Sequence, residues 1–195
     1  MGNIRMKLEV IEYTYDEFEQ DINALYEDFA ADPDNYPDLI IGVSRGGLIP
    51  ATRLSHRLGI PMRCLHYNTR DHAEYSTYMT TSFLDEMKFI YNMVASGKRV
   101  VIVEDIIDSG KTIAAIQKTY NNLAKAYGEN TKGTLTYASL IYNVDLDVKP
   151  EYTAKYISRK ENDQWYVFWW EHKELLSPNR YEQIRNIRSW QIPSA

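Results

Sequence analysis

Short apolar runs alternate with amphipathic segments along most of this chain. Apolar runs predict buried strands at residues 39–43 and 99–104, and further segments of strand length predict strands at 60–67, 135–142, 152–158 and 165–170. Apolar residues at helical spacing predict helices after a capping box at residues 14–17, over 48–58, 83–95 and 111–127, and from residue 177. This alternation indicates an α/β fold, with a central parallel sheet flanked by helices and ligands at the carboxyl ends of the strands.

The composition is that of a folded domain with a sizeable core. The chain has 195 residues, of which 44% are hydrophobic, and its net charge of −5 disfavours a protein that coats nucleic acid or membrane. No apolar run approaches the roughly 18 residues of a membrane span, and no signal-peptide core follows Met1, so we expect a cytoplasmic protein. The single cysteine, Cys64, excludes an intramolecular disulfide, and its apolar neighbours predict a buried strand thiol.

The most informative segment is the apolar run at 99–104 together with the loop that follows it. The run leads into two adjacent carboxylates, Glu104 and Asp105, and the sequence Asp-Ser-Gly-Lys-Thr at 108–112 then opens a helix. The first turn of a helix has unpaired N–H groups and a partial positive charge, which suits a phosphate. The acidic pair suits sugar hydroxyls or a phosphate-bound Mg²⁺. The segment therefore predicts a site for a phosphorylated sugar.

Residues Gly110, Lys111 and Thr112 also look like the end of a P-loop. A P-loop requires a glycine five positions before Gly110, and this chain has Asp105 there. A carboxylate in the middle of a phosphate cradle would repel the ligand, so we reject this alternative.

A second loop, Ser-Arg-Gly-Gly at 44–47, also connects a predicted strand to a predicted helix. Two glycines allow the backbone to approach a ligand closely, and Arg45 offers a planar fork of donors to phosphate oxygens. A glycine turn beside an arginine is usually only a connection. Paired with the loop at 108–112, it becomes a candidate for a second phosphate site.

The segment 100–112 resembles the phosphoribosyl-pyrophosphate motif of the type I phosphoribosyltransferases, and most of all their 6-oxopurine branch (hypoxanthine, guanine and xanthine phosphoribosyltransferases). The resemblance covers the core of the motif without a gap. It implies that Glu104 and Asp105 contact the ribose and Mg²⁺. It implies a 5′-phosphate loop at 108–112, to which Ser109, Gly110, Lys111 and Thr112 contribute. It also implies that Asp108 lies near N7 of a purine as the proton acceptor.

By the same resemblance, the loop at 44–47 is the pyrophosphate loop. This assigns Ser44, Arg45 and Gly46 to the leaving pyrophosphate, with Arg45 as a catalytic cation. Members of the family commonly have a non-proline cis peptide at this place, so we expect one between Ser44 and Arg45.

The aromatic segment at 163–171 resembles the hood of the xanthine–guanine branch, where a ring stacks on the flat face of the purine. The resemblance implies that Trp165 stacks on the base, that Tyr166 reads its edge, and that Glu171 contacts an exocyclic group or a metal-bound water. Clustered tryptophans are most often core residues, and we expect this of Trp169 and Trp170.

One position departs from the family pattern. The family usually has a lysine shortly after the strand equivalent to 140–142, and this chain has Asn143. An amide can donate or accept, so Asn143 could bind a 6-oxo group, tolerate a 6-amino group, or not reach the base. Residues 69–76 fall where the family has a loop that closes over the reaction, and we expect His72 to be a solvated loop histidine.

The resemblance implies one phosphoribosyltransferase domain over residues 1–195, with a core at about 36–145 and a small hood from about 146–195 plus the N-terminal segment. It implies Mg²⁺-dependent transfer of a phosphoribosyl group from phosphoribosyl pyrophosphate to N9 of a purine, in purine salvage, by a homodimer or tetramer. Two alternatives stay open. One is a non-catalytic nucleotide-sensing regulator on the same fold, and the other is a phosphoribosyltransferase for another base, such as orotate or uracil.

Overall fold

The computed structural model describes residues 9–34, 36–67, 76–128, 131–161 and 164–171. They divide into a large compact unit, Gln20–Ser158, and a small unit that combines residues before Gln20 with residues after Ser158. The sequence predicts a hood that starts near residue 146. In the structure a further strand, β6 (Tyr152–Ile157), pairs with the sheet and lies within the large unit.

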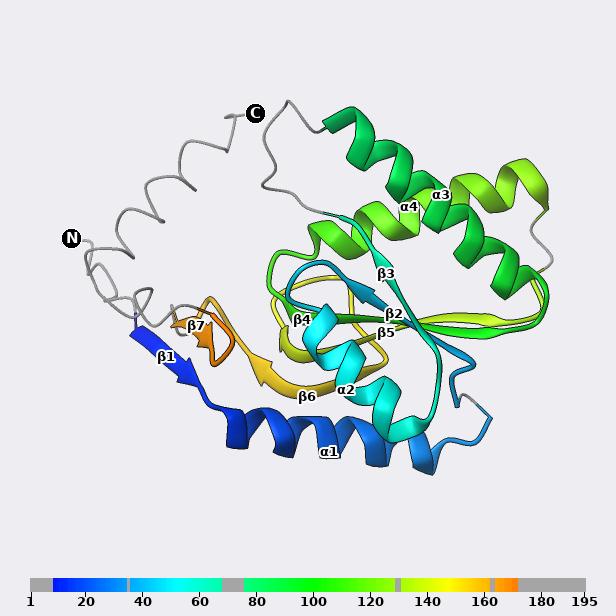
Figure 1. Cartoon of the computed structure of the whole chain (residues 1–195). Coiled ribbons are helices and arrows are strands. Elements are labelled where there is room, and N and C mark those ends of the chain that lie inside the picture. Colours follow the sequence, from blue (N-terminus) through cyan, green and yellow to red (C-terminus); the bar gives the residue numbers. More distant parts are fainter. Residues whose placement is uncertain (1–8, 35, 68–75, 129–130, 162–163, 172–195) are drawn as a thin grey trace. The chain divides into compact units, whose positions relative to one another are not determined.

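A five-stranded parallel sheet forms the centre of the large unit (Figure 1), in the order β3-β2-β4-β5-β6. The other strands are β2 (Leu39–Val43), β3 (Met62–Leu65), β4 (Arg99–Ile107) and β5 (Thr134–Asn143). All five positions of β2 are buried, which explains its unbroken apolar run. The parallel α/β sheet predicted from the sequence is confirmed.

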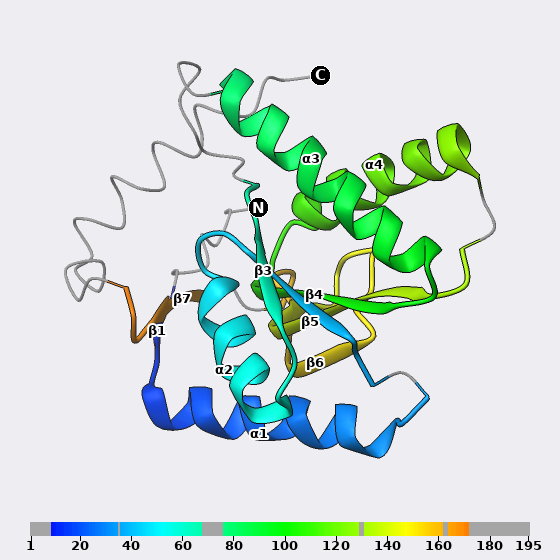
Figure 2. The ribbon, with the colours of Figure 1, turned by 45° about the vertical axis from the view of Figure 1, so that its right-hand side comes forward.

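The helices are α1 (Tyr15–Ala31), α2 (Leu48–Leu58), α3 (Ser76–Ala95) and α4 (Lys111–Tyr127). Within the large unit, α3 and α4 cover one face of the sheet and α2 lies on the other (Figures 1 and 2). Apolar side chains of α3, α4 and the strands form the core between them, including Ile41, Met87, Ile90, Ile102 and Ile113. None of the helices in the described part of the chain is long and apolar enough to cross a membrane.

Several element boundaries follow the sequence closely and others do not. The capping box is present, because Glu17 N–H donates to Thr14 Oγ1 at 3.2 Å and Thr14 N–H donates to Glu17 Oε2 at 2.9 Å. Strand β4 continues to Ile107, so Glu104 and Asp105 belong to the strand itself. Helix α3 begins at Ser76, earlier than the predicted start at residue 83.

The order of the strands in the sheet changes direction between β2 and β4, although the strands themselves stay parallel. These two strands are neighbours, with Leu39 opposite Val100. From β2 the chain continues to β3 on one side, whereas from β4 it continues to β5 on the other. In open α/β sheets, ligands bind beyond the carboxyl ends of the strands at such a switch point. The loops that follow β2 and β4 therefore occupy the expected place for a site.

The small unit contains two paired strands and an aromatic cluster. Strand β1 (Glu9–Tyr13) pairs in parallel with β7 (Gln164–Phe168), with Val10 opposite Trp165. The rings of Phe168 and Trp170 stack with centroids 4.6 Å apart. Trp169 was expected in the core, but 43% of it is exposed even though its ring contacts those of Tyr15, Phe18 and Trp170.

Candidate active site

The loops after β2 and β4 touch each other through a glycine. A Cβ atom on Gly46 would overlap the carboxylate of Asp105 and would lie 2.8 Å from its Oδ1. A Cβ atom on Gly47 would overlap the carbonyl oxygen of Val103 and lie 2.8 Å from that of Val43. Only glycine permits so close an approach. The two sequence motifs, separate along the chain, therefore converge at the switch point of the sheet.

The peptide bond between Ser44 and Arg45 is cis, as predicted. Ser44 N–H donates to the carbonyl of Leu65 at 2.9 Å, which joins this loop to the end of β3. The hydroxyl of Ser44 lies 3.2 Å from Nδ1 of His66, whose Nε2 lies 3.8 Å from Sγ of Cys64. Burial raises the pKa of the Cys64 thiol, and the Ser44 hydroxyl partly offsets this. Sequence reasoning did not place His66 here, although it directly follows a strand at the same edge of the sheet.

The acidic pair consists of two half-buried residues, and one carboxyl oxygen of the pair is fully buried. Oε1 of Glu104 is buried and has no hydrogen-bond partner within the described residues. Burial raises the pKa of Glu104 well above its usual value, the charge of Asp105 adds to this, and the Thr112 hydroxyl opposes it. Oδ1 of Asp105 accepts the N–H of Ile106 at 2.9 Å. Buried acceptors usually have a donor, so Glu104 is suited to hydroxyl groups of a ligand.

The loop at 108–112 presents an open helix terminus. Gly110 is the N-cap of α4 with φ +69°, the left-handed conformation that glycine adopts readily. No side chain caps this terminus, and the first turn of α4 contains no acidic residue. The same is true of α2 after the loop at 44–47. Two uncapped helix starts thus follow neighbouring strands, and each favours an anion.

Asn143 supports the loop from the neighbouring strand. Its side chain is buried, with 4% of the residue exposed. Nδ2 donates to the carbonyl oxygen of Asp108 at 3.0 Å, and Oδ1 accepts the N–H of Asp145 at 3.1 Å. The sequence left open whether this amide reaches the base. In the structure, both ends of the amide bind main chain, and the group fastens the start of the 108–112 loop to the end of β5.

The predicted base-contacting residues lie in the small unit. Trp165 and Tyr166 are half-buried in β7, and the Tyr166 hydroxyl donates to Oε1 of Gln164 at 3.3 Å. Glu171 folds back on the end of this strand, where its Oε2 accepts the N–H of Phe168 at 3.0 Å. The predicted closing loop at 69–76, including His72, lies outside the described residues except for Ser76, the first residue of α3.

A magnesium site would have to use few protein ligands. Within the described ranges, no group of three or more His, Cys, Asp or Glu side chains is arranged to hold a metal ion. Mg²⁺ usually binds one or two carboxylates, and substrate phosphates and waters complete its shell. Glu104 and Asp105, with a buried oxygen that lacks a donor, fit a metal ion of this kind that binds together with a phosphorylated ligand.

Comparisons with known proteins agree with this geometry. The sequence model of the phosphoribosyl transferase domain matches residues 13–172. The solved structure of a purine phosphoribosyltransferase from Pyrococcus horikoshii is 28% identical, with a TM-score of 0.58, and the match covers 85% of this chain and 96% of that one.

Two more distant structures support the fold alone. The xanthine-guanine-hypoxanthine phosphoribosyltransferase of Helicobacter pylori is 17% identical (TM-score 0.57), and the match covers 93% of this chain and 99% of that one. A hypothetical protein of Neisseria gonorrhoeae with bound ppGpp is 22% identical (TM-score 0.60), with the same coverage of both chains. Because the family model spans most of its length and the sheet has the expected topology, this chain belongs to the phosphoribosyl transferase domain family and has the type I fold.

Proposed function

We propose that this protein transfers a phosphoribosyl group from phosphoribosyl pyrophosphate to N9 of a 6-oxopurine and releases pyrophosphate. The observation that carries this proposal is the contact of Gly46 with the Asp105 carboxylate. That contact brings a candidate pyrophosphate loop, an acidic pair and a candidate 5′-phosphate loop to one edge of the sheet. The purine preference is supported by the resemblance of the motif and by the similarity to the Pyrococcus horikoshii enzyme.

Each part of the donor substrate has a matching group. The amides and hydroxyls of Ser109, Gly110 and Thr112 would bind the 5′-phosphate at the uncapped start of α4, with Lys111 adding positive charge. Glu104 and Asp105 would accept hydrogen bonds from the ribose hydroxyls. The acidic pair and the phosphates of the substrate would together hold Mg²⁺. The bound ion would neutralise charge on the pyrophosphate.

The other loop would bind the leaving group. The backbone of Ser44 and Gly46 and the guanidinium of Arg45 would contact the pyrophosphate oxygens. His66, hydrogen-bonded to the Ser44 hydroxyl at 3.2 Å, would orient this loop as a positioning residue. Neutralising the departing pyrophosphate is the main electrostatic contribution that these residues can make to catalysis.

The chemistry at C1′ needs one proton acceptor. The bond from C1′ to pyrophosphate breaks and its electron pair leaves with the pyrophosphate, while N9 of the base forms the new bond to C1′. The base loses the proton on N7, and Asp108 would accept it. The bond from Asn143 to the Asp108 carbonyl supports a role for Asn143 in positioning this residue.

The base would be bound by the small unit. Trp165 is proposed to stack on the purine and Tyr166 to bind its edge, in accordance with the resemblance of segment 163–171 to the hood of the family. The carboxylate of Glu171 accepts a main-chain N–H of its own turn, so any contact of Glu171 with the base or with a metal-bound water would be made in addition to that bond.

The decisive experiment measures pyrophosphate release from phosphoribosyl pyrophosphate and Mg²⁺ with hypoxanthine, guanine, xanthine, adenine, orotate and uracil in parallel. We expect turnover with at least one 6-oxopurine. Activity confined to adenine, or to a pyrimidine, would contradict the base assignment. Nucleotide binding without turnover of any base would indicate a regulator instead. The Asp108→Asn variant serves as the matched control for contaminating activity.

A further inference from the structure

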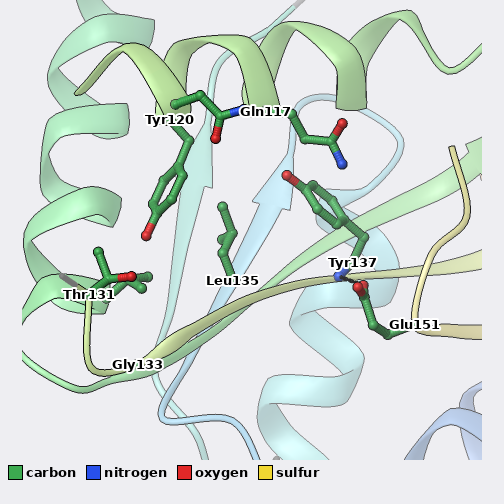
Figure 3. A pocket seen from close by; sticks show the side chains of 9 residues that line it. Gln117, Tyr120, Thr131, Gly133, Leu135, Tyr137 and Glu151 are labelled. Atoms are coloured by element: carbon green, nitrogen blue, oxygen red, sulfur yellow. Dashed lines mark hydrogen bonds between the residues drawn. The ribbon is translucent and has the colours of Figure 1, made fainter. Parts of the chain in front are cut away.

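A cavity of about 360 Å³ lies away from the proposed active site, between α4, the first half of β5 and the start of β6 (Figure 3). Side chains that line it include Gln117, Tyr120 and Asn121 of α4, Leu135 and Tyr137 of β5, and Glu151. Tyr137 precedes Asn143 by six residues on the same strand, which is about 20 Å at 3.3 Å per residue. The cavity is therefore separate from the loops at 44–47 and 108–112.

The cavity contains a buried polar group that makes no hydrogen bond with the described protein. Tyr137 is 5% exposed, and its hydroxyl is buried without a partner. Figure 3 shows this hydroxyl directed toward Gln117, across the cavity from the ring of Tyr120. Burial raises the pKa of Tyr137 and the nearby Gln117 amide opposes this, although the two groups do not form a hydrogen bond of ordinary geometry. Buried polar groups nearly always have a partner, so this hydroxyl is suited to a ligand.

The lining has the chemistry of a site for a flat, uncharged heterocycle. Two tyrosine rings and Leu135 supply apolar surface, and the amides of Gln117 and Asn121 supply both donors and acceptors. Glu151, whose Oε2 already accepts the N–H of Tyr137 at 2.7 Å, adds a carboxylate that favours N–H donors. Among the described residues that line the cavity there is no lysine or arginine, which disfavours a phosphorylated ligand.

We infer that this cavity is a second ligand site, which binds a free nucleobase or an unphosphorylated nucleoside with the Tyr137 hydroxyl as one of its hydrogen-bond partners. A volume of about 360 Å³ is at the lower end of the usual range for small-molecule sites, roughly 300–1,000 Å³, and suits a ligand of this size. The proposal does not depend on which base the active site uses, because none of the lining residues named here belongs to the proposed catalytic loops.

Chemical-shift mapping by NMR on the full chain locates the binding directly. The probes are hypoxanthine and adenine as free bases and adenosine as a nucleoside, each titrated to millimolar concentration. We expect shifts at Gln117, Tyr120, Asn121 and Tyr137 with at least one probe. The free bases and adenosine distinguish whether the site accepts the sugar. Shifts confined to residues 44–47, 104–112 and 165–166, or no shifts at all, would overturn the inference.

The variant Tyr137→Phe tests the role of the hydroxyl, because it keeps the ring and removes only the unpartnered group. We expect binding at the cavity to weaken at least tenfold, while Tm stays at or above that of the wild type and turnover is unchanged. Tyr36→Phe is the matched control, since its hydroxyl donates to the Leu58 carbonyl at 3.1 Å; we expect it to lower Tm and leave cavity binding intact. A lowered Tm with unchanged cavity binding in Tyr137→Phe would show that the hydroxyl is structural.

Discussion

Replacing Gly46 with alanine tests the contact between the two loops. The new methyl group would coincide with the Asp105 carboxylate, which would have to move by more than about 1 Å to reach a van der Waals separation of about 3.5 Å. The obstacle is the end of a side chain, which can rotate away, so the fold should survive. At Gly47 the obstacles are the carbonyl oxygens of Val103 and Val43, which cannot rotate, so Gly47→Ala should mainly lower stability.

The expected loss for Gly46→Ala follows from the displacement of Asp105. A misplacement of about 1 Å in a group that positions the substrate can reduce the rate on the order of 10²-fold. That corresponds to about 2.7 kcal/mol of transition-state stabilisation, at roughly 1.36 kcal/mol for each factor of ten. Steady-state pyrophosphate release, with phosphoribosyl pyrophosphate varied at saturating base, should show a higher KM for this substrate and a lower kcat. The KM for the base should change much less.

Gly59→Ala is the matched control for this experiment. Gly59 ends α2 with φ +67°, and a Cβ atom there would have no other atom within 4 Å. Alanine should therefore cost only the backbone penalty of about 1–2 kcal/mol in the free energy of unfolding and leave turnover unchanged. Wild-type kcat/KM for phosphoribosyl pyrophosphate in Gly46→Ala would refute the reasoning, as would an equal loss of activity in Gly59→Ala.

Three further substitutions test single residues. Asp108→Asn should lose on the order of 10²-fold in kcat, and near-wild-type turnover would contradict its proposed role as proton acceptor. Asn143→Ala should lower the free energy of unfolding by about 1–3 kcal/mol and reduce turnover equally for every base, whereas a changed base preference would show that the amide reads the base. The main-chain N–H of Arg99 donates to the Asp38 carboxylate and holds the pKa of Asp38 below its usual 3.8. The charged carboxylate therefore stabilises the folded protein above that pH, and this stabilisation is lost as the pH falls through the folded-state pKa. Urea unfolding at several acidic pH values should show that the free energy of unfolding depends less on pH in Asp38→Asn than in the wild type. The same dependence on pH in both proteins would contradict this account.

The local parts of the fold could be predicted from the sequence. Strand β2 and helix α2 have the predicted bounds, because one is a continuous apolar run and the other begins with a proline in the first turn, where its missing N–H is tolerated. Strand β1 was not predicted as a strand. Its sequence is short and its partner is β7, so the pairing depends on residues far away in the chain.

The candidate site shows the same limit. Both loops were identified because each motif is contiguous, and the cis bond at Ser44 followed from the family resemblance. The contacts that assemble the site join residues distant in sequence. Gly46 meets Asp105, Asn143 binds the Asp108 carbonyl, and His66 approaches Ser44. No periodicity or motif encodes these pairs, and only the order of strands in the sheet brings them together.

The pairing of β1 with β7 has a consequence for how the protein is made on the ribosome. The large unit ends at Ser158, whereas Glu9–Tyr13 cannot find its partner until Gln164–Phe168 has been synthesised. Domains tend to fold as units while the chain is still growing. A nascent chain would thus complete both proposed phosphate-binding loops before the segment proposed to hold the base has formed, and that segment is the last of the described strands to gain its partner.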